Sequence, residues 1–305
     1  MRVPLALLLL VASPLTAQSP RVTTSPARPV RGQLFTVTVR LADSLRLEAG
    51  SAAGEPLHFR RIPAAAAPSR AGAAEGARTA TRPMVHRAIG AVPIEGPDTL
   101  VLSLVVPRGP APDAPRDTVA VPLVTAPGNY RTEQLTVAPE FGREPDSALA
   151  RRIAEEGAKA RAVAVASHDT PRLWSAPFVL PRASRVTSGF GTARTFNGAV
   201  QTRHMGVDFA GAVGAPVRAA NRGVVALVVD FYLAGRAVYV DHGEGLVSGY
   251  FHLSRADVAP GDTVARGHVI GRVGRSGRVT GPHLHWVMRY GAVSVDPRSA
   301  VGLKR

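Results

Sequence analysis

Residues 203–208 read RHMGVD, and residues 281–285 near the C-terminus read GPHLH. The first stretch places His204 four residues before Asp208, and the second places His283 and His285 two residues apart. Imidazoles and a carboxylate suit zinc as ligands, and three protein ligands leave a fourth position open for water. An open zinc polarises carbonyl groups and lowers the pKa of bound water to ~7. Together the two stretches predict a zinc site of a hydrolase.

The local sequence predicts that both stretches are extended or turning rather than helical. Gly206 and Val207 separate His204 from Asp208, and no Glu follows His204, so the helical metalloprotease motif is absent. On a strand, residues i and i+2 point to the same face, so His283 and His285 would reach one site.

The remaining histidines divide into one further candidate and several that we expect to be structural. His252 follows the apolar run 246–250, so it would join the site from a third segment. His242 lies in a turn-like stretch, and His268 begins a strand-like one. His58 and His86 stand alone in the N-terminal part and are predicted to be surface or packing residues.

The chain is predicted to be mainly β, because its 30 Gly and 26 Pro allow many turns and few long helices. Residues 20–138 are predicted to form an antiparallel sandwich of immunoglobulin-like type, and residues 174–305 a second antiparallel β domain. Predicted strands of the first region lie at 34–41, 99–106, 117–121 and 134–137, and those of the second at 224–229, 237–240, 246–250, 268–273 and 283–288. A connecting helix is expected over 145–168, capped by Asp146 or Ser147, and an exposed loop over 64–76.

Residues 1–17 have the pattern of a signal peptide. Arg2 precedes the apolar run 5–12, and Ala17 offers a cleavage site. We therefore expect export to the periplasm, the cell envelope or the exterior, with no stable membrane span after cleavage; the alternative is an uncleaved anchor. The absence of cysteine excludes disulfides, thiolate ligands and lipid attachment at cysteine.

The net charge of +15 favours attraction to an anionic polymer such as a cell wall, although an arginine-rich composition explains it equally well. The basic residues are scattered and no nucleic-acid motif is present, so nucleic acid is not an expected partner. Residues 271–277 carry three glycines but lack the lysine and helix of a phosphate-binding loop. We predict a glycine-rich loop near the metal site there.

Over about residues 174–298 the motifs resemble the M23 family of zinc peptidases, the lysostaphin-like or LytM-like cell-wall endopeptidases. The matching segments are 188–191 (SGFG), 204–208 (HMGVD), 214–217 (GAPV), 241–245 (DHGEG) and 281–285 (GPHLH), together with Gly261, Asp262 and Gly267. The resemblance implies a LytM-like fold and Zn²⁺ bound by His204, Asp208 and His285. It also implies catalytic roles for His283 and His252, and peptidoglycan cross-bridges as the substrate.

Those implied roles give a mechanism and leave one gap. His283 would act as general base and return the proton to the leaving amine, while His252 would stabilise the oxyanion together with the metal. Family members often carry a Tyr shortly before the first ligand, and residues 196–201 contain none. Asn197 and Arg203 are the candidate substitutes.

Two other functions remain open at this point. Some relatives have lost ligands and act as binding or activating modules for other wall hydrolases, whereas this chain keeps all five positions. The chain could instead cleave secreted proteins. The sandwich would either position the enzyme on the wall or cover its groove, and any regulatory protein partner is unknown.

Overall fold

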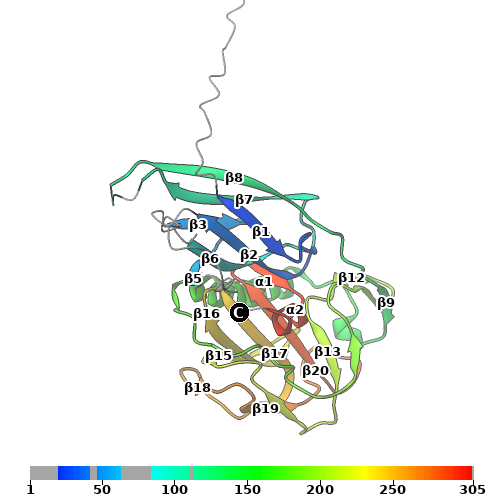
Figure 1. The fold of residues 1–305 in the computed structure, drawn as a ribbon. Helices are drawn as coiled ribbons and strands as arrows, with labels where there is room; N and C mark the ends of the chain where they lie inside the picture. Colours follow the sequence, from blue (N-terminus) through cyan, green and yellow to red (C-terminus); the bar gives the residue numbers. More distant parts are fainter. Residues whose placement is uncertain (1–19, 42–46, 63–83, 110, 112, 304–305) are drawn as a thin grey trace, which may run out of the picture.

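The computed structural model describes residues 20–41, 47–62, 84–109, 111 and 113–303. The predicted leader and the predicted loop at 64–76 lie outside these residues. In the described part, antiparallel sheets dominate and one helix, α1, is long, so the predicted mainly β class is confirmed (Figure 1). None of the helices in these ranges is long and apolar enough to cross a membrane.

Two antiparallel sheets pack face to face in the N-terminal part. One has the order β1 (Arg21–Ser25), β2 (Leu34–Leu41), β6 (Met84–Ala91), β5 (Arg60–Ile62), and the other the order β4 (Glu55–Pro56), β3 (Ala49–Ala52), β7 (Thr99–Pro107), β8 (Arg116–Val124). Alternate residues of β2 and β7 point inward, which fully buries Val37, Val39, Leu102 and Leu104 between the sheets. This alternation is what made both strands predictable.

The strand order of the sandwich can be compared with that of immunoglobulin domains. Lettered along the chain, the sheets have the orders A-B-E-D and C′-C-F-G, which immunoglobulin-type sandwiches share. The immunoglobulin-like subclass stays a prediction, and this order favours it.

The prediction that residues 134–137 complete the sandwich is wrong. β9 (Thr132–Leu135) instead runs parallel to β11 (Ala193–Phe196), whose other neighbour is β12 (Val200–Arg203). Alternation identifies a strand but not its partner. Because β9 pairs with β11, Glu133 lies beside the C-terminal domain.

One large sheet forms the C-terminal domain, with the order β10-β13-β20-β17-β16-β15-β18, while β14, β19 and β21 pair at its sides. The bounds are β10 (Val186–Ser188), β13 (Val207–Ala210), β14 (Pro216–Arg218), β15 (Gly223–Phe231), β16 (Gly235–Gly243), β17 (Leu246–Ala256), β18 (Thr263–Val264), β19 (Val269–Val273), β20 (His283–Tyr290) and β21 (Val293–Val295). The five predicted strands of this region correspond to β15, β16, β17, β19 and β20. Trp286 and Tyr250 are completely buried in the core of this domain.

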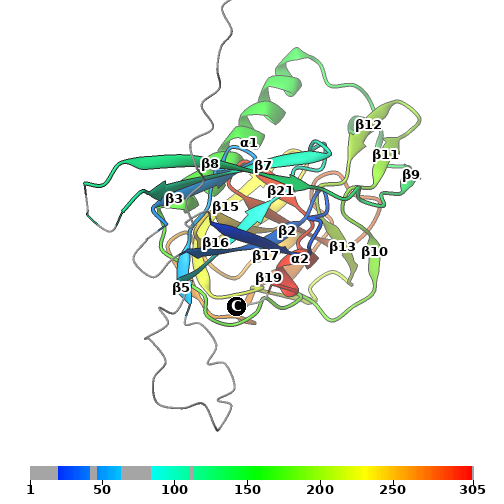
Figure 2. The same cartoon turned by 45° about the horizontal axis from the view of Figure 1, so that its top comes forward.

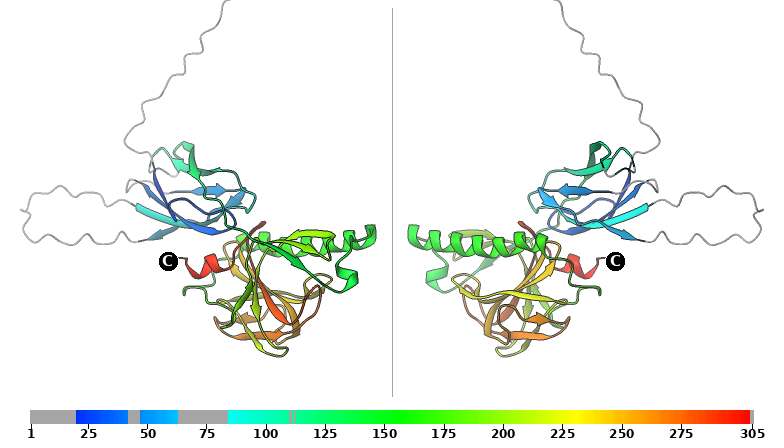
Figure 3. Two further views of the ribbon diagram at one scale, coloured as in Figure 1. Left: turned by 90° about the vertical axis from the view of Figure 1, so that its right-hand side faces the viewer. Right: turned by 90° about the vertical axis from the view of Figure 1, so that its left-hand side faces the viewer.

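The helix expected over 145–168 is α1 (Ser147–Ala166), and the Asp146 side chain caps it by accepting a hydrogen bond from Leu149 N. It lies between the sandwich and the C-terminal domain and extends beyond both (Figures 2 and 3). Its buried residues are Ala160 and Ala164, which pack near Tyr239 of β16. Because these side chains are small, α1 can lie close to the sheet. Three short helices complete the described part of the chain: η1 (Pro139–Phe141), η2 (Ser167–Asp169) and α2 (Arg298–Val301).

His168, in η2, joins the two domains. Its Nε2 lies 2.9 Å from Glu55 Oε2, and its Nδ1 lies 2.8 Å from His58 Nε2. His58 is therefore a packing residue at this joint, and His86 is a buried packing residue of the sandwich. Both agree with the predicted structural roles.

Candidate active site

His204, Asp208 and His285 meet where β13 lies beside β20. In this antiparallel pair Asp208 stands directly opposite His285, so both side chains point to one face of the sheet. His204 precedes β13 by three residues. Between them, a Cβ at Gly206 would come within 2.6 Å of His285 Cε1, so a residue without a side chain lets the segment approach.

The donor atoms of these three side chains form a small triangle. His204 Nε2 lies 3.0 Å from Asp208 Oδ1 and 2.9 Å from His285 Nδ1, and His285 Nδ1 lies 2.7 Å from Asp208 Oδ1. Such a group could hold a metal ion. The structure thus brings together the three side chains that the sequence predicted as ligands.

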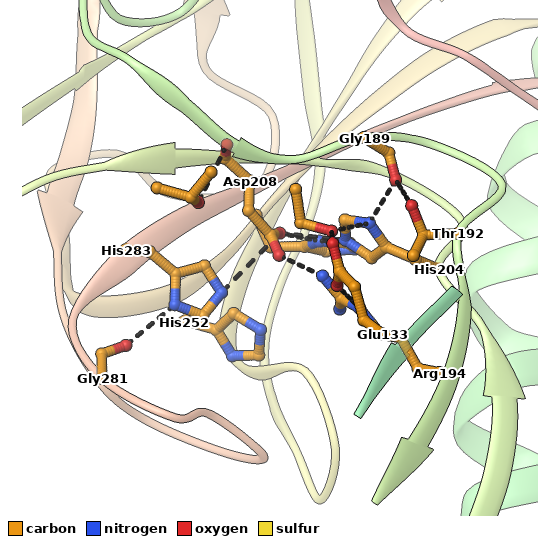
Figure 4. Close-up of polar contacts among 12 residues, drawn as sticks. Glu133, Gly189, Thr192, Arg194, His204, Asp208, His252, Gly281 and His283 are labelled. Atoms are coloured by element: carbon orange, nitrogen blue, oxygen red, sulfur yellow. Dashed lines mark hydrogen bonds and ion pairs between the residues drawn. The ribbon is translucent and has the colours of Figure 1, made fainter. Parts of the chain in front are cut away.

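The hydrogen bond on the far side of His204 supports a cation in the triangle. Its Nδ1 donates to Gly189 O over 2.8 Å (Figure 4), and a carbonyl oxygen can only accept. In the neutral imidazole, Nε2 then carries a lone pair and no proton, and this lone pair faces a lone pair of Asp208 Oδ1. A divalent cation satisfies both, and a carbonyl behind a ligating histidine is the usual means of fixing its tautomer. Two imidazoles and a carboxylate fit Zn²⁺.

His283 and His252 line the same cavity as the triangle, and each ring is held by a hydrogen bond from Nδ1 to a backbone carbonyl. His283 Nδ1 donates to Gly281 O and His252 Nδ1 to Ser276 O, each over 2.8 Å (Figure 4 shows the first). Both Nε2 atoms are therefore acceptors in the neutral rings. The His283 Nε2 lies 3.7 Å from Asp208 Oδ1. The ring centroids of His283 and His252 are 4.9 Å apart.

Burial favours the neutral forms of His285 and His252, and the carboxylate of Asp208 stays ionised. Burial lowers the pKa of His285 to about 4, despite the Asp208 carboxylate beside it. Burial, aided by His285 and His283, also lowers the pKa of His252 well below its usual value. Burial alone would raise the pKa of Asp208, but His204 and His285 hold it well below its usual range. Neutral imidazole and ionised carboxylate are the forms that bind metal.

The backbone at His252 is unusual for a residue in a strand. Its φ is +61°, in the left-handed region that residues with a side chain rarely adopt. Such a conformation persists where the surroundings impose it, often at functional sites. Gly274 lies against this segment: a Cβ at Gly274 would lie 2.3 Å from Ser254 N and 2.7 Å from His252 O. Of the glycine-rich loop predicted at 271–277, residues 271–273 belong to β19, and the part after the strand lies near the metal site, where the Ser276 carbonyl accepts from His252.

All five predicted site residues line one cavity of about 570 Å³.

The sequence around this cavity is similar to that of a known protein family. Residues 202–297 match the family model described as Peptidase family M23. The C-terminal domain belongs to peptidase family M23.

The M23 domain has curated relatives that match over part of their length. Over 116 residues it is 37% identical to "Peptidoglycan DD-endopeptidase ShyC" of Vibrio cholerae serotype O1. The aligned residues make up 38% of this chain and 27% of the relative. Over 83 residues it is 45% identical to "Peptidoglycan DD-endopeptidase ShyA" of the same organism. These residues make up 27% of this chain and 19% of that relative. The chain thus spans about a quarter or less of the length of these relatives.

A crystal structure of a candidate M23 peptidase from Pseudomonas aeruginosa is similar over most of both molecules. It covers 90% of this chain and 96% of its own, with a TM-score of 0.59 and 24% sequence identity. At this identity the similarity concerns the fold. It includes the sandwich as well as the M23 domain.

Two residues that contact the predicted metal ligands were missed by sequence reasoning. Arg194 Nη2 donates to Asp208 Oδ2 over 2.6 Å, which leaves Oδ1 for the metal, and Arg194 also contacts Glu133 (Figure 4). Glu133 in turn accepts from Ser188 Oγ. No motif marks Arg194, and Glu133 lies on β9, which reaches the site from outside the M23 domain.

Replacement of Arg194 by glutamine is expected to weaken zinc binding about 10- to 100-fold, because partners behind a ligand fix its orientation. Titration of the apoprotein with zinc measures this. The control is Arg255→Gln, because Arg255 is exposed and pairs with Asp257 outside the cavity. Equal zinc affinity in Arg194→Gln and the wild type would show that Arg194 does not position Asp208.

The two candidate substitutes for the family's Tyr are otherwise engaged. The Asn197 side chain binds both the N–H and the carbonyl of Val137, so it anchors the end of β9. Arg203 pairs with Glu95 at 2.8 Å and donates to Gly191 O. None of these contacts involves one of the five site residues, although Arg203 lines the same cavity, so both substitutes stay predictions.

The two remaining histidines of the M23 domain have the structural roles that were predicted. His242 is fully buried, with its ring bonded to Arg222 O and Ser248 Oγ. His268 is exposed and precedes β19.

Proposed function

We propose that this protein is an exported zinc metalloendopeptidase that hydrolyses the peptide cross-bridges of peptidoglycan. The observation that carries the proposal is the convergence of His204, Asp208 and His285 with His283 and His252 on one cavity. The relatives named as peptidoglycan DD-endopeptidases support the substrate. The signal-peptide pattern and the net charge of +15 support action on an anionic polymer outside the cytoplasm.

The chain's own groups divide the chemistry between them. When bound by His204, Asp208 and His285, Zn²⁺ would supply a Lewis acid that polarises the scissile carbonyl and acidifies water. His283 accepts a proton from the attacking water at Nε2, because its Nδ1 proton is held by Gly281 O. His283 then returns that proton to the leaving amine.

For His252 we propose a role other than the oxyanion stabilisation that the family resemblance implied. An oxyanion donor needs a proton at Nε2, but the bond from Nδ1 to Ser276 O leaves Nε2 as an acceptor in the neutral ring. Burial opposes the doubly protonated form. We therefore assign His252 to accept a hydrogen bond from the attacking water and orient it toward the carbonyl.

The proposal is tested by incubating the purified protein with purified sacculi and analysing the released muropeptides by mass spectrometry. Cross-linked dimers should decline and monomers accumulate. A chelator should stop the reaction, and added zinc should restore it, because the proposed Lewis acid would be removed and returned. Stoichiometric zinc without cleavage of sacculi would instead indicate a binding or activating module. Cleavage of secreted proteins but not of sacculi would assign a different substrate.

A further inference from the structure

Arg278 lies in the wall of the active-site cavity. Its Cζ is 4.1 Å from the centre of the Phe196 ring, and both residues line the cavity. Within the ranges that the structure describes, its side chain makes no hydrogen bond or ion pair. Burial lowers the pKa of the guanidinium, and the nearby charge of Arg194 lowers it further.

The other charges of the cavity do not neutralise Arg278. Four arginines (Arg185, Arg194, Arg203 and Arg278) and two acidic residues (Glu133 and Asp208) line it. Both acids are already engaged by Arg194. The field in the cavity is therefore positive before any metal binds, and it attracts anions.

Arg278 is also held firmly in place. Its backbone N–H donates to Leu233 O over 2.9 Å. The preceding Gly277 has a φ of +74°, and a Cβ there would lie 2.4 Å from Gly235 N. The guanidinium thus stands on a fixed turn, stacked on an aromatic ring, which lowers the cost of ordering it when a ligand binds.

A partly buried cation without a partner is costly, and an anion from outside would remove that cost. The planar fork of a guanidinium matches a carboxylate, with which it forms two parallel hydrogen bonds. Arg278 follows Ser276, whose carbonyl binds His252, by two residues, so such an anion would lie near the reacting groups.

We propose that Arg278 binds a free carboxylate of the peptide substrate near the scissile bond and thereby determines specificity. The carboxylate is either a C-terminal α-carboxylate or an acidic side chain. This assignment rests on the proposed peptidase function, and the experiment below separates the failure of one from the failure of the other.

The test uses three matched synthetic peptides: one with both carboxylates free, one with the C-terminal carboxylate amidated, and one with the acidic side chain amidated. One of the two amidated peptides lacks the carboxylate that Arg278 recognises. For the wild type, the KM of the peptide with both carboxylates free should be about 10- to 100-fold lower than the KM of that amidated peptide, as expected for charge-assisted hydrogen bonds. Arg278→Gln should reduce that ratio to about one, and Arg278→Lys should retain part of it. The control Arg275→Gln should keep the full ratio, because Arg275 is exposed in the same loop and does not line the cavity.

Equilibrium binding of the same peptides, measured by fluorescence anisotropy on chelator-treated protein, provides a readout without turnover. If the wild type cleaves the peptides but shows no preference for either carboxylate, the role of Arg278 is overturned and the peptidase proposal stands. If nothing is cleaved while binding still prefers the carboxylate through Arg278, the peptidase proposal fails and the Arg278 site stands. If Arg278→Gln retains the wild-type ratio, Arg278 only packs on Phe196.

Discussion

His204→Ala is expected to lose zinc and activity together. The His204 Nε2 is one of three donors that meet within 3.0 Å of one another, and its tautomer is set by Gly189 O. Losing a partner behind a ligand already costs about 10–100-fold in affinity, so losing the ligand itself should cost more. Hydrolysis of sacculi should fall by more than the ~10²–10³-fold that one oxyanion donor contributes. Zinc per chain by elemental analysis and initial rates measure the two effects.

A change of fold must be separated from the loss of the ligand in this experiment. Thermal unfolding with and without zinc does so, because a ligand at 100 times its Kd stabilises the native state by about 2.7 kcal/mol. The melting temperature of the wild type should rise with zinc, and that of His204→Ala should not. His268→Ala serves as the matched control, because His268 is an exposed histidine outside the triangle. Stoichiometric zinc in a folded His204→Ala protein would remove His204 from the ligand set.

Strand periodicity made one part of this site predictable: a two-residue spacing places His283 and His285 on one face of β20. The grouping of His204 and Asp208 with His285 was implied by the family resemblance, because β13, which brings Asp208 opposite His285, was not among the predicted strands. The alternation of β2 and β7 likewise revealed the sandwich. In both cases a short repeat in the sequence corresponds to a repeat in the backbone.

The rest depends on contacts that no local pattern encodes. Glu133 reaches Arg194 only because β9 leaves the sandwich and pairs with β11. The backbone after His252 packs against Gly274, 22 residues later, and the tautomer of His252 depends on Ser276 O. Tautomers follow from such through-space hydrogen bonds. This is why the sequence placed His252 at the site but did not indicate that the bond to Ser276 O favours an acceptor role for its Nε2 over the suggested donor role.

His283→Ala is expected to separate catalysis from metal binding. The His283 side chain is 15% exposed, which gives it access to water from the cavity, and its Nδ1 proton is held by Gly281 O. Its Nε2 is 3.7 Å from Asp208 Oδ1, farther than any distance within the ligand triangle. Zinc content should therefore stay near one per chain. The kcat should fall about 10²–10⁴-fold, the usual contribution of a general base, and KM should change little.

Comparison with His285→Ala makes the assignment sharp, because the two histidines are two residues apart on one strand and on one face of it. If His283 is the base and His285 a ligand, the first variant keeps zinc and loses turnover, and the second loses both. Loss of zinc from His283→Ala with retention in His285→Ala would exchange the two roles. Activity of His283→Ala near that of the wild type would assign the proton transfer elsewhere. His252 is then the next group to test, because its Nε2 is also a free acceptor and its ring centre lies 4.9 Å from that of His283.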